Sequence, residues 1–285
     1  MKSLGLVNGN LVDINENVVP MEDRGHQFGD GVYEFVKIYN GKCFALKPHL
    51  ERLYRSLRAI RIPAVYTFEE LVEFHELLIE KSGIVEGAIY LQITRGVAPR
   101  THGFPEKIIP CLTMSIRPSQ KVNTHLREQG VKIILIPDER WLRCDIKSLN
   151  LLGNILGKQL AKEAGCFEGV MVRNEHITEG TSSNFFVVKD DVIWTYPATH
   201  LILNGITRMI ILEKLAKELN LTILEKPFTI QFIQGASEAF LSGTSTEIMP
   251  ATTIDGVLVG DGTVGPITRS IQTAYTRLID EECGR

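Results

Sequence analysis

Short runs of apolar and β-branched residues, separated by turn-forming residues, recur along most of the chain. The first run, Val32–Ala45, contains Asn40-Gly41, a pair that accepts the left-handed backbone of a type I′ turn and so predicts a β-hairpin. The pairs Asp190-Asp191 and Asp255-Gly256 predict two more tight turns. The other predicted strands are Ala88–Thr94, Ile108–Ile116, Val131–Ile136, Glu168–Arg173, Asn184–Val188 and Val192–Thr195, with short strands on both sides of Gly243.

Apolar residues spaced three and four apart predict helices between these strands. The segment Leu50–Ile60 has this spacing. A second helix is expected to begin after Thr67, which forms a capping box with Glu70, and to end near Gly83. His75 is expected on the solvated face of that helix. Three more helices are predicted at Leu149–Gly165, Ile206–Leu219 and Ile267–Asp280.

The order of these elements indicates the fold class. Strands occur in clusters with antiparallel-type turns rather than in strict alternation with helices, which predicts an α+β fold and not a doubly wound sheet. The polar, aperiodic stretch 117–127 is expected to connect two domains. We therefore predict a small N-terminal α+β domain over residues 1–118, a linker over 119–128 and a large C-terminal α+β domain over 129–285.

Composition excludes several classes of partner. The net charge of −3, from 31 basic and 34 acidic residues, provides no positive excess for binding nucleic acid or an anionic membrane. The five cysteines are odd in number and contain no C-x-x-C pair, which argues against a disulfide framework and favours a reducing compartment. No apolar run approaches the roughly 18 residues of a membrane span, and no signal-peptide pattern is present. A cytoplasmic location is expected, without nucleic acid or membrane as partner.

Familiar catalytic motifs are absent from the sequence. It has no P-loop, no G-x-G-x-x-G, no H-E-x-x-H and no G-x-S-x-G. The hypotheses of a nucleotide-binding protein, a zinc protease and a serine hydrolase therefore lose their main support, and no metal is expected.

Three polar segments suit anion or carbonyl chemistry, each with a structural alternative. In Leu203–Arg208 a glycine leads into a helix, whose first amides and dipole favour a phosphate; an ordinary loop-to-helix junction has the same pattern. Leu241–Thr246 places hydroxyl residues around Gly243, which suits a phosphate or a hairpin turn. In Thr178–Asn184 the carboxylate of Glu179 lies among hydroxyls before an apolar strand, and it either holds a cationic nitrogen or caps a turn.

Positively charged residues mark two further candidates. Lys147 lies in an aperiodic stretch between a buried strand and a helix. A lysine near other cations or away from water loses its proton more readily, as an amine that bonds a carbonyl must, but the pattern alone does not distinguish Lys147 from the other lysines. Arg100 and His102 lie two residues apart in a loop shaped by glycine and proline, where they face one carboxylate or are two solvated charges.

Taken in order, these segments resemble the fold-type IV pyridoxal-phosphate enzymes, and among them the aminotransferases that act on D-amino acids. The resemblance covers nearly the whole chain and is most specific in Glu22–Glu34, Trp141–Asn150 and Thr178–Asn184. It departs mildly at Thr181 and Ser182, where the family often has a run of serines, and this departure keeps the hydroxyl groups.

The resemblance implies a role for each matching residue. Lys147 would form the Schiff base with pyridoxal 5′-phosphate and move the proton of the substrate's α-carbon. Glu179 would meet the pyridine nitrogen, and Tyr33, Arg100 and His102 would hold the substrate's α-carboxylate. The implied cofactor-binding residues are Lys147, Arg52, Glu179, Thr181, Ser182, Leu203, Ile206, Thr207, Gly243 and Thr244.

The resemblance also implies an activity and an assembly. The amino group would pass between D-amino acids (D-alanine, D-glutamate) and 2-oxo acids (2-oxoglutarate, pyruvate) in a two-step, ping-pong exchange. Because the family's arginine and histidine reach in from the neighbouring subunit, a homodimer is implied. A branched-chain L-amino acid aminotransferase and an aminodeoxychorismate lyase are the alternatives within the same fold, and a pyridoxal-phosphate-binding or phosphate-sugar-binding protein without turnover is the alternative outside it.

Overall fold

The computed structural model describes residues 3–119 and 123–284, and their contacts separate into two compact units. Both units combine helices with β-sheet, so the predicted α+β class is confirmed. Among the described residues, the first unit comprises 3–119, 146–150 and 279–284, and the second comprises 123–145 and 151–278.

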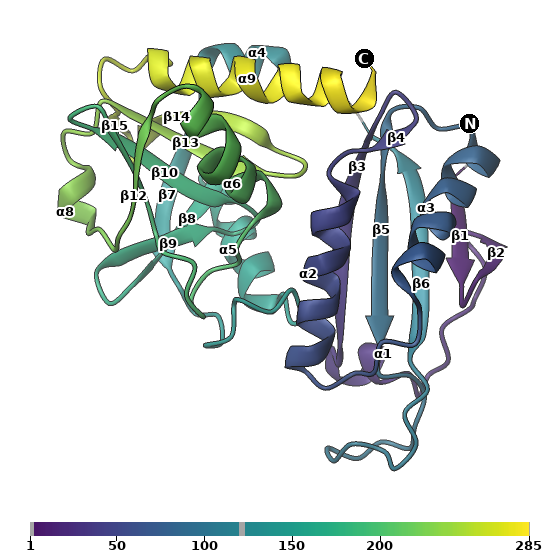
Figure 1. The fold of residues 1–285 in the computed structure, drawn as a ribbon. Helices are drawn as coiled ribbons and strands as arrows, with labels where there is room; N and C mark the ends of the chain where they lie inside the picture. The colour runs from purple at the N-terminus through teal and green to yellow at the C-terminus, as the bar shows by residue number, and fades with distance from the viewer. Residues whose placement is uncertain (1–2, 120–122, 285) are drawn as a thin grey trace. The chain divides into compact units, whose positions relative to one another are not determined.

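The sheet of the first unit is antiparallel throughout, in the order β2-β1-β6-β5-β3-β4 (Figure 1). The predicted hairpin at Asn40-Gly41 is present, and both residues have positive φ (48° and 73°), as a type I′ turn requires. The strands are β1 (Leu4–Val7), β2 (Asn10–Asp13), β3 (Gly31–Tyr39), β4 (Lys42–Cys43), β5 (Gly87–Thr94) and β6 (Cys111–Pro118).

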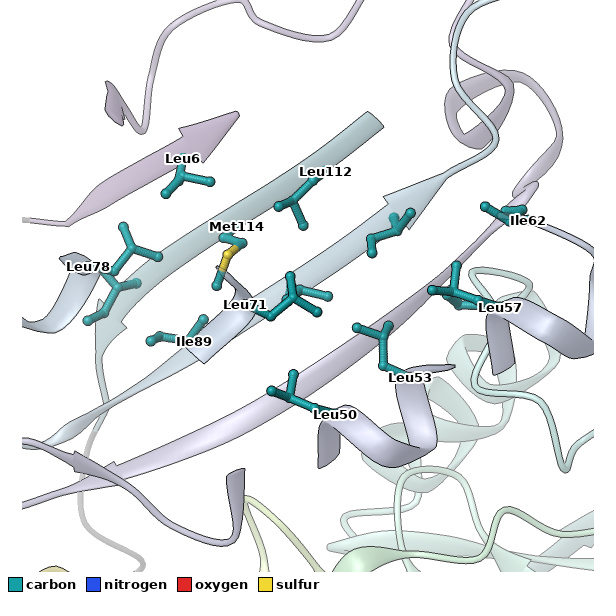
Figure 2. Packing of buried hydrophobic residues seen from close by; sticks show 14 of the residues in the cluster. Leu6, Leu50, Leu53, Leu57, Ile62, Leu71, Leu78, Ile89, Leu112 and Met114 are labelled. Atoms are coloured by element: carbon teal, nitrogen blue, oxygen red, sulfur yellow. The ribbon is translucent and has the colours of Figure 1, made fainter. Parts of the chain in front are cut away.

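Two helices, α2 (Leu46–Ala59) and α3 (Phe68–Ser82), pack on this sheet, and the short α1 (Arg24–Phe28) precedes β3. Helix α3 has the predicted limits, because Thr67 and Glu70 form the reciprocal capping box and Gly83 ends the helix with φ of 66°. Figure 2 shows Leu50, Leu53 and Leu57 of α2 in one core with Ile89 of β5 and with Leu112 and Met114 of β6. The labelled members of this core are Leu6, Leu50, Leu53, Leu57, Ile62, Leu71, Leu78, Ile89, Leu112 and Met114.

The expectation for His75 is wrong. Its side chain is completely buried on α3, and its Nδ1 lies 2.6 Å from the carbonyl oxygen of Leu71. Burial lowers the pKa of His75 to about 4, so the imidazole is neutral at pH 7. His75 lies four residues after Leu71 and three before Leu78, on the same helix face as these two fully buried residues.

The sheet of the second unit is mixed, in the order β12-β11-β10-β13-β14-β7-β8-β9, with β15 paired to β14 (Figure 1). The pairs β11–β12, β14–β7 and β7–β8 are parallel. The strands are β7 (Val131–Pro137), β8 (Glu168–Arg173), β9 (His176–Gly180), β10 (Asn184–Lys189), β11 (Val192–Thr195), β12 (Thr222–Glu225), β13 (Glu238–Gly243), β14 (Glu247–Ile254) and β15 (Val257–Leu258).

The helices of the remaining chain agree largely with prediction. The predicted helix Ile206–Leu219 is continuous but contains a π-helical turn, η1. The predicted helix Leu149–Gly165 begins at Leu152, because the residues before it bond to β3 instead. The helices are α4 (Thr124–Gln129), α5 (Leu152–Glu163), α6 (Ile206–Ile210), η1 (Ile211–Leu215), α7 (Ala216–Glu218), α8 (Ile230–Ile233) and α9 (Pro266–Cys283).

The division into units differs from the predicted domains around the linker, around Lys147 and at residues 279–284, which belong to the first unit. Within the predicted linker 119–128, residues 120–122 lie outside the described part of the chain. Helix α4 begins after Asn123, whose side chain caps the amides of His125 and Leu126. Ile146–Asn150, predicted in the C-terminal domain, belongs to the first unit, and Ile146 is part of that unit's core.

Candidate functional site

The segment that carries Lys147 is attached to β3 by backbone hydrogen bonds. The amide of Tyr33 donates to the Lys147 carbonyl at 2.9 Å, and the amide of Leu149 donates to the Gly31 carbonyl at 3.1 Å. Ser148 pairs with Val32 as an isolated antiparallel bridge. The backbone of Lys147 is therefore fixed by bonds that do not involve its side chain.

The Lys147 side chain lies against an aromatic face. Its Nζ is 4.2 Å from the centroid of the Tyr33 ring, and Tyr33 stacks on Tyr90 with centroids 5.5 Å apart. This brings together two residues that were predicted to be functional. The electron-rich face of an aromatic ring attracts a nearby ammonium group.

A buried charge cluster joins β3 to α2 in the same unit. The Glu34 carboxylate is fully buried and accepts from Arg52 Nε and Nη2, each at 2.8 Å, in a bidentate pair. His49 Nδ1 donates to the same carboxylate at 2.8 Å. Burial opposes ionisation of Glu34, but the Arg52 charge and these hydrogen bonds hold its pKa well below the usual range.

Burial also determines the charge of His49. Desolvation lowers its pKa, and the charges of Arg52 and Lys147 act in the same direction against the opposing effect of Glu34. The cluster therefore contains one ionised pair, Glu34 with Arg52, and a neutral His49 imidazole that donates one hydrogen bond to Glu34. Arg52 was a predicted site residue, whereas sequence reasoning missed Glu34 and His49. The period-2 pattern contains a signal for Glu34, since Val32 and Val36 on the same face of β3 are fully buried.

Arg100 and His102 lie in the loop between β5 and β6, and both are exposed. The guanidinium carbon of Arg100 is 4.9 Å from the centroid of the Phe28 ring, and the His102 ring is 5.7 Å from it. The pair therefore shares one aromatic neighbour.

Glu179, on β9 of the second unit, is the centre of a second buried cluster. Its carboxylate accepts from Arg140 Nη1 at 2.5 Å, from Asn184 Nδ2 at 2.9 Å and from the Leu203 amide at 3.0 Å. Burial raises the pKa of Glu179, while Arg140 and the Leu203 amide counteract it. Leu203 therefore contributes through its backbone.

Arg140, which binds Glu179, is also bound by Asp138. The Arg140 guanidinium donates to both carboxylate oxygens of Asp138, each at 2.9 Å, and Arg173 also pairs with that carboxylate at 2.9 Å. Although burial opposes ionisation, these two arginines lower the pKa of Asp138 to about 2. Sequence reasoning missed both Asp138 and Arg140, whose signal is a charged run directly after the buried strand β7.

The hydroxyl residues after β9 bond to a carboxylate that was not predicted. Ser182 Oγ donates to Glu168 Oε2 at 2.9 Å, Ser183 Oγ donates to the same atom at 3.2 Å, and Thr181 Oγ1 donates to Glu168 Oε1. Glu168 is fully buried on β8. Thr181 and Ser182, predicted at the cofactor, thus have their hydroxyl protons directed at Glu168.

The predicted anion-binding residues lie at a helix start and a strand end. Ile206 and Thr207 open α6, and a Cβ on the preceding Gly205 would lie 2.2 Å from Asn184 Oδ1, so only glycine permits this approach to the Glu179 cluster. Gly243 is the last residue of β13, and Thr244 follows it. Beside them, the buried Ser242 Oγ has no hydrogen-bond partner among the described residues.

Each of these groups offers a distinct chemical function within its own unit. An amine is available to a carbonyl at Lys147, a buried carboxylate can accept a ring N–H at Glu179, and amides and hydroxyls can donate to a dianion near Thr207 and Thr244. These are the aldehyde, pyridine and phosphate partners of pyridoxal 5′-phosphate, so the residues fit that cofactor. Over 3–119 and 123–284, no group of three or more His, Cys, Asp or Glu residues has a metal-binding arrangement, and no helix meets the length and apolarity needed to span a bilayer.

The chain is similar to aminotransferases both in sequence and in fold. The family model "Amino-transferase class IV" matches residues 31–254. A D-alanine aminotransferase from Bacillus licheniformis is 45% identical over 280 residues, which cover 98% of this chain and 98% of that protein. One from Staphylococcus aureus (strain COL) is 44% identical over 275 residues, covering 96% and 97%. Among solved structures, a branched-chain amino acid aminotransferase from Escherichia coli has a TM-score of 0.92 at 29% identity, covering 98% of this chain and 95% of that one.

Proposed function

We propose, from the premise that the chain belongs to the class IV aminotransferase family, that it exchanges amino groups between D-amino acids, D-alanine among them, and 2-oxo acids. The observation that carries the proposal is the 45% identity to a D-alanine aminotransferase along 98% of both chains. Aminotransferases of this family use pyridoxal phosphate. Amino acids and 2-oxo acids are accordingly the substrate classes.

The residues assigned to the cofactor have distinct roles. We assign the covalent attachment to Lys147 and the pyridine nitrogen to Glu179, whose carboxylate is held in place by Arg140, Asn184 and Leu203. The phosphate is assigned to Arg52, Ile206, Thr207 and Thr244, and the remaining cofactor-binding residues are Thr181, Ser182, Leu203 and Gly243. When bound, pyridoxal phosphate withdraws electrons from the substrate's α-carbon and makes its hydrogen acidic.

Protein groups then perform the proton transfer. The Lys147 Nζ, held over the Tyr33 ring, would take the proton from the substrate's α-carbon and deliver it to the former aldehyde carbon of the cofactor, so that the amino group stays with the cofactor and a 2-oxo acid is released after hydrolysis. The fixed Lys147 backbone limits the positions that Nζ can reach. The buried Glu179 carboxylate places a negative charge where a protonated ring nitrogen is needed, and Arg140 keeps that carboxylate oriented.

The substrate's α-carboxylate is assigned to Tyr33, Arg100 and His102. We propose a homodimer in which Arg100 and His102 of one subunit hold the carboxylate of the substrate in its partner. The exposure of both side chains supports this assignment, since their charges are available to an incoming group. A subunit contact is further supported by an exposed apolar row on α5, formed by Leu152, Ile155, Leu156 and Leu160.

Arg100→Ala tests the carboxylate assignment. Loss of a charge-assisted hydrogen bond to a carboxylate is expected to raise KM for D-alanine and 2-oxoglutarate by roughly 10- to 100-fold. The cofactor is expected to stay bound, because Arg100 is not among its proposed ligands. Steady-state kinetics and the absorbance of bound cofactor measure both effects. Arg277→Ala, which removes an exposed arginine paired with Glu218, is the matched control. Unchanged KM in Arg100→Ala would remove Arg100 from the site.

One specific observation favours a second candidate, a branched-chain L-amino acid aminotransferase. The solved structure with that name superposes with a TM-score of 0.92. Its 29% identity is lower than the 45% to the D-alanine aminotransferase, and substrate choice depends on side chains more than on backbone shape. We therefore place the D-amino acid activity first.

A further inference from the structure

Arg24, which has no role in the site as described so far, connects the interior of the first unit to the Arg100 loop. It lies on α1 and is 3% exposed. Its Nε donates to Asp30 Oδ2 at 2.8 Å, and its Nη1 donates to the backbone carbonyl of Thr101 at 2.7 Å. Thr101 is the residue between Arg100 and His102. One buried guanidinium therefore holds the backbone of this exposed pair.

Asp30, the carboxylate that accepts from Arg24, has a second arginine partner. Asp30 also accepts from Arg95, through Nε at 2.8 Å and Nη2 at 2.9 Å. Arg95 is 2% exposed and donates to the carbonyls of Ile60 and Arg61 beyond the end of α2. Burial opposes ionisation of Asp30, but the two arginines lower its pKa, so the carboxylate remains charged at neutral pH.

Other contacts of the loop lie beside this carbonyl, since Thr101 Oγ1 donates to the Gly103 carbonyl at 3.5 Å and the guanidinium carbon of Arg95 lies 3.7 Å from the centroid of the Phe104 ring. Arg100 and His102 are exposed and contact the Phe28 ring, and the guanidinium carbon of Arg24 lies 4.9 Å from the centroid of the same ring. Flexible donors lose conformational entropy when they bind a ligand, and a fixed backbone reduces that loss. A carbonyl anchored between the two donors fixes their spacing before any ligand arrives.

We propose that Arg24 is a positioning residue for substrate recognition, which anchors the Thr101 carbonyl so that Arg100 and His102 present a preformed pair of donors to the substrate's carboxylate. The inference rests on the proposed function, in which Arg100 and His102 bind that carboxylate. It adds a buried residue that acts through them and does not touch the substrate.

The geometry requires arginine at this position. Two N–H groups of the planar Arg24 guanidinium donate to two different acceptors, Asp30 and the Thr101 carbonyl. A lysine keeps the positive charge beside Asp30 but has a single ammonium on a flexible chain, and it cannot reproduce the divergent pair of donors. Arg24→Lys therefore separates the anchoring role from the charge.

The test is the kinetics of Arg24→Lys holoenzyme. KM for both D-alanine and 2-oxoglutarate is expected to rise about tenfold, as for loss of one oriented hydrogen bond, while kcat changes less than about threefold. Arg277→Lys, at an exposed arginine of the second unit, is the control and should leave both constants unchanged. If Arg24→Lys does not accumulate as folded protein, Arg24→Gln, which keeps an N–H donor without the charge, replaces it with the same expectation for KM.

A double-mutant cycle with Arg100→Ala distinguishes positioning from general loosening of the structure. If Arg24 acts through Arg100, Arg24→Lys is expected to change KM less than about threefold in the Arg100→Ala background. The same tenfold rise in both backgrounds, or no rise in either, would overturn the proposal. If Arg100→Ala alone leaves KM unchanged, the carboxylate assignment fails and this inference fails with it, whereas a raised KM in Arg100→Ala together with a silent Arg24→Lys overturns only the inference.

Discussion

Lys147→Ala is expected to lower kcat for transamination by roughly 10²- to 10⁴-fold, the range attributed to a positioned proton-transfer group. The protein is expected to fold normally. The Lys147 carbonyl accepts from the Tyr33 amide and the Lys147 amide lies 3.4 Å from Ser56 Oγ, contacts that alanine retains. Cofactor should bind without a covalent bond, since the groups assigned to its phosphate and pyridine nitrogen are untouched.

Three measurements on the same preparation test this expectation. Circular dichroism reports the fold, borohydride reduction followed by peptide mass analysis reports covalent attachment, and a coupled assay reports kcat. Lys81→Ala, which removes a half-exposed lysine near the end of α3, is the control and should be indistinguishable from the unmodified protein. Full activity in Lys147→Ala, or cofactor attached to a different lysine, would refute the assignment.

Glu34→Gln is expected to lower the free energy of unfolding by about 3–5 kcal/mol, because it removes the carboxylate from a buried ion pair and leaves the arginine behind. Glu34 is fully buried and accepts both Arg52 donors and the His49 Nδ1 proton. Glutamine matches the shape of glutamate but carries no charge. Because Arg52 is also assigned to the cofactor phosphate, cofactor affinity should fall as well.

Urea unfolding of the cofactor-free protein measures the stability effect. Glu80→Gln is the matched control, because Glu80 forms an exposed pair with Lys81, and such pairs contribute about 0–1 kcal/mol. A loss in Glu34→Gln no larger than that of Glu80→Gln would contradict the expected energetic role of the cluster.

The Glu34 pair also predicts a dependence of stability on pH. The pKa of Glu34 in the folded protein is below its ordinary value of 4.5, so between these two values the unfolded chain binds a proton that the folded chain does not. This contribution to stability is complete above pH 4.5 and is lost as the pH falls below it. In Glu34→Gln the contribution is absent, and the decline in stability on acidification should be less steep.

Local patterns predicted those elements whose signals lie within a few residues. The capping box of Thr67 and Glu70 and the terminal Gly83 are such signals, and α3 has those limits. The hairpin β1–β2 was missed although Asn8-Gly9 has positive φ at both residues, because the strand Asn10–Asp13 has no apolar alternation to mark it.

The site is harder to predict because its contacts join distant segments. Glu34 pairs with Arg52, 18 residues away, and Arg140 meets Glu179 across 39 residues. The sequence predicts no strand at β9, since the buried Thr178 and Glu179 of β9 are stabilised by hydrogen bonds that periodicity cannot reveal. Lys147 was distinguished from the other lysines by resemblance, and the structure adds its attachment to β3.

The direct test of the proposed activity is a half-reaction with no acceptor present. Holoenzyme is mixed with D-alanine, and separately with L-leucine, while the cofactor's absorption band and the 2-oxo acid formed are recorded. The D-amino acid proposal predicts loss of the band and about one pyruvate per subunit with D-alanine, and no change with L-leucine, since one face of the substrate is presented to the base. Loss of the band with L-leucine and not with D-alanine would contradict the proposal and identify the branched-chain activity instead.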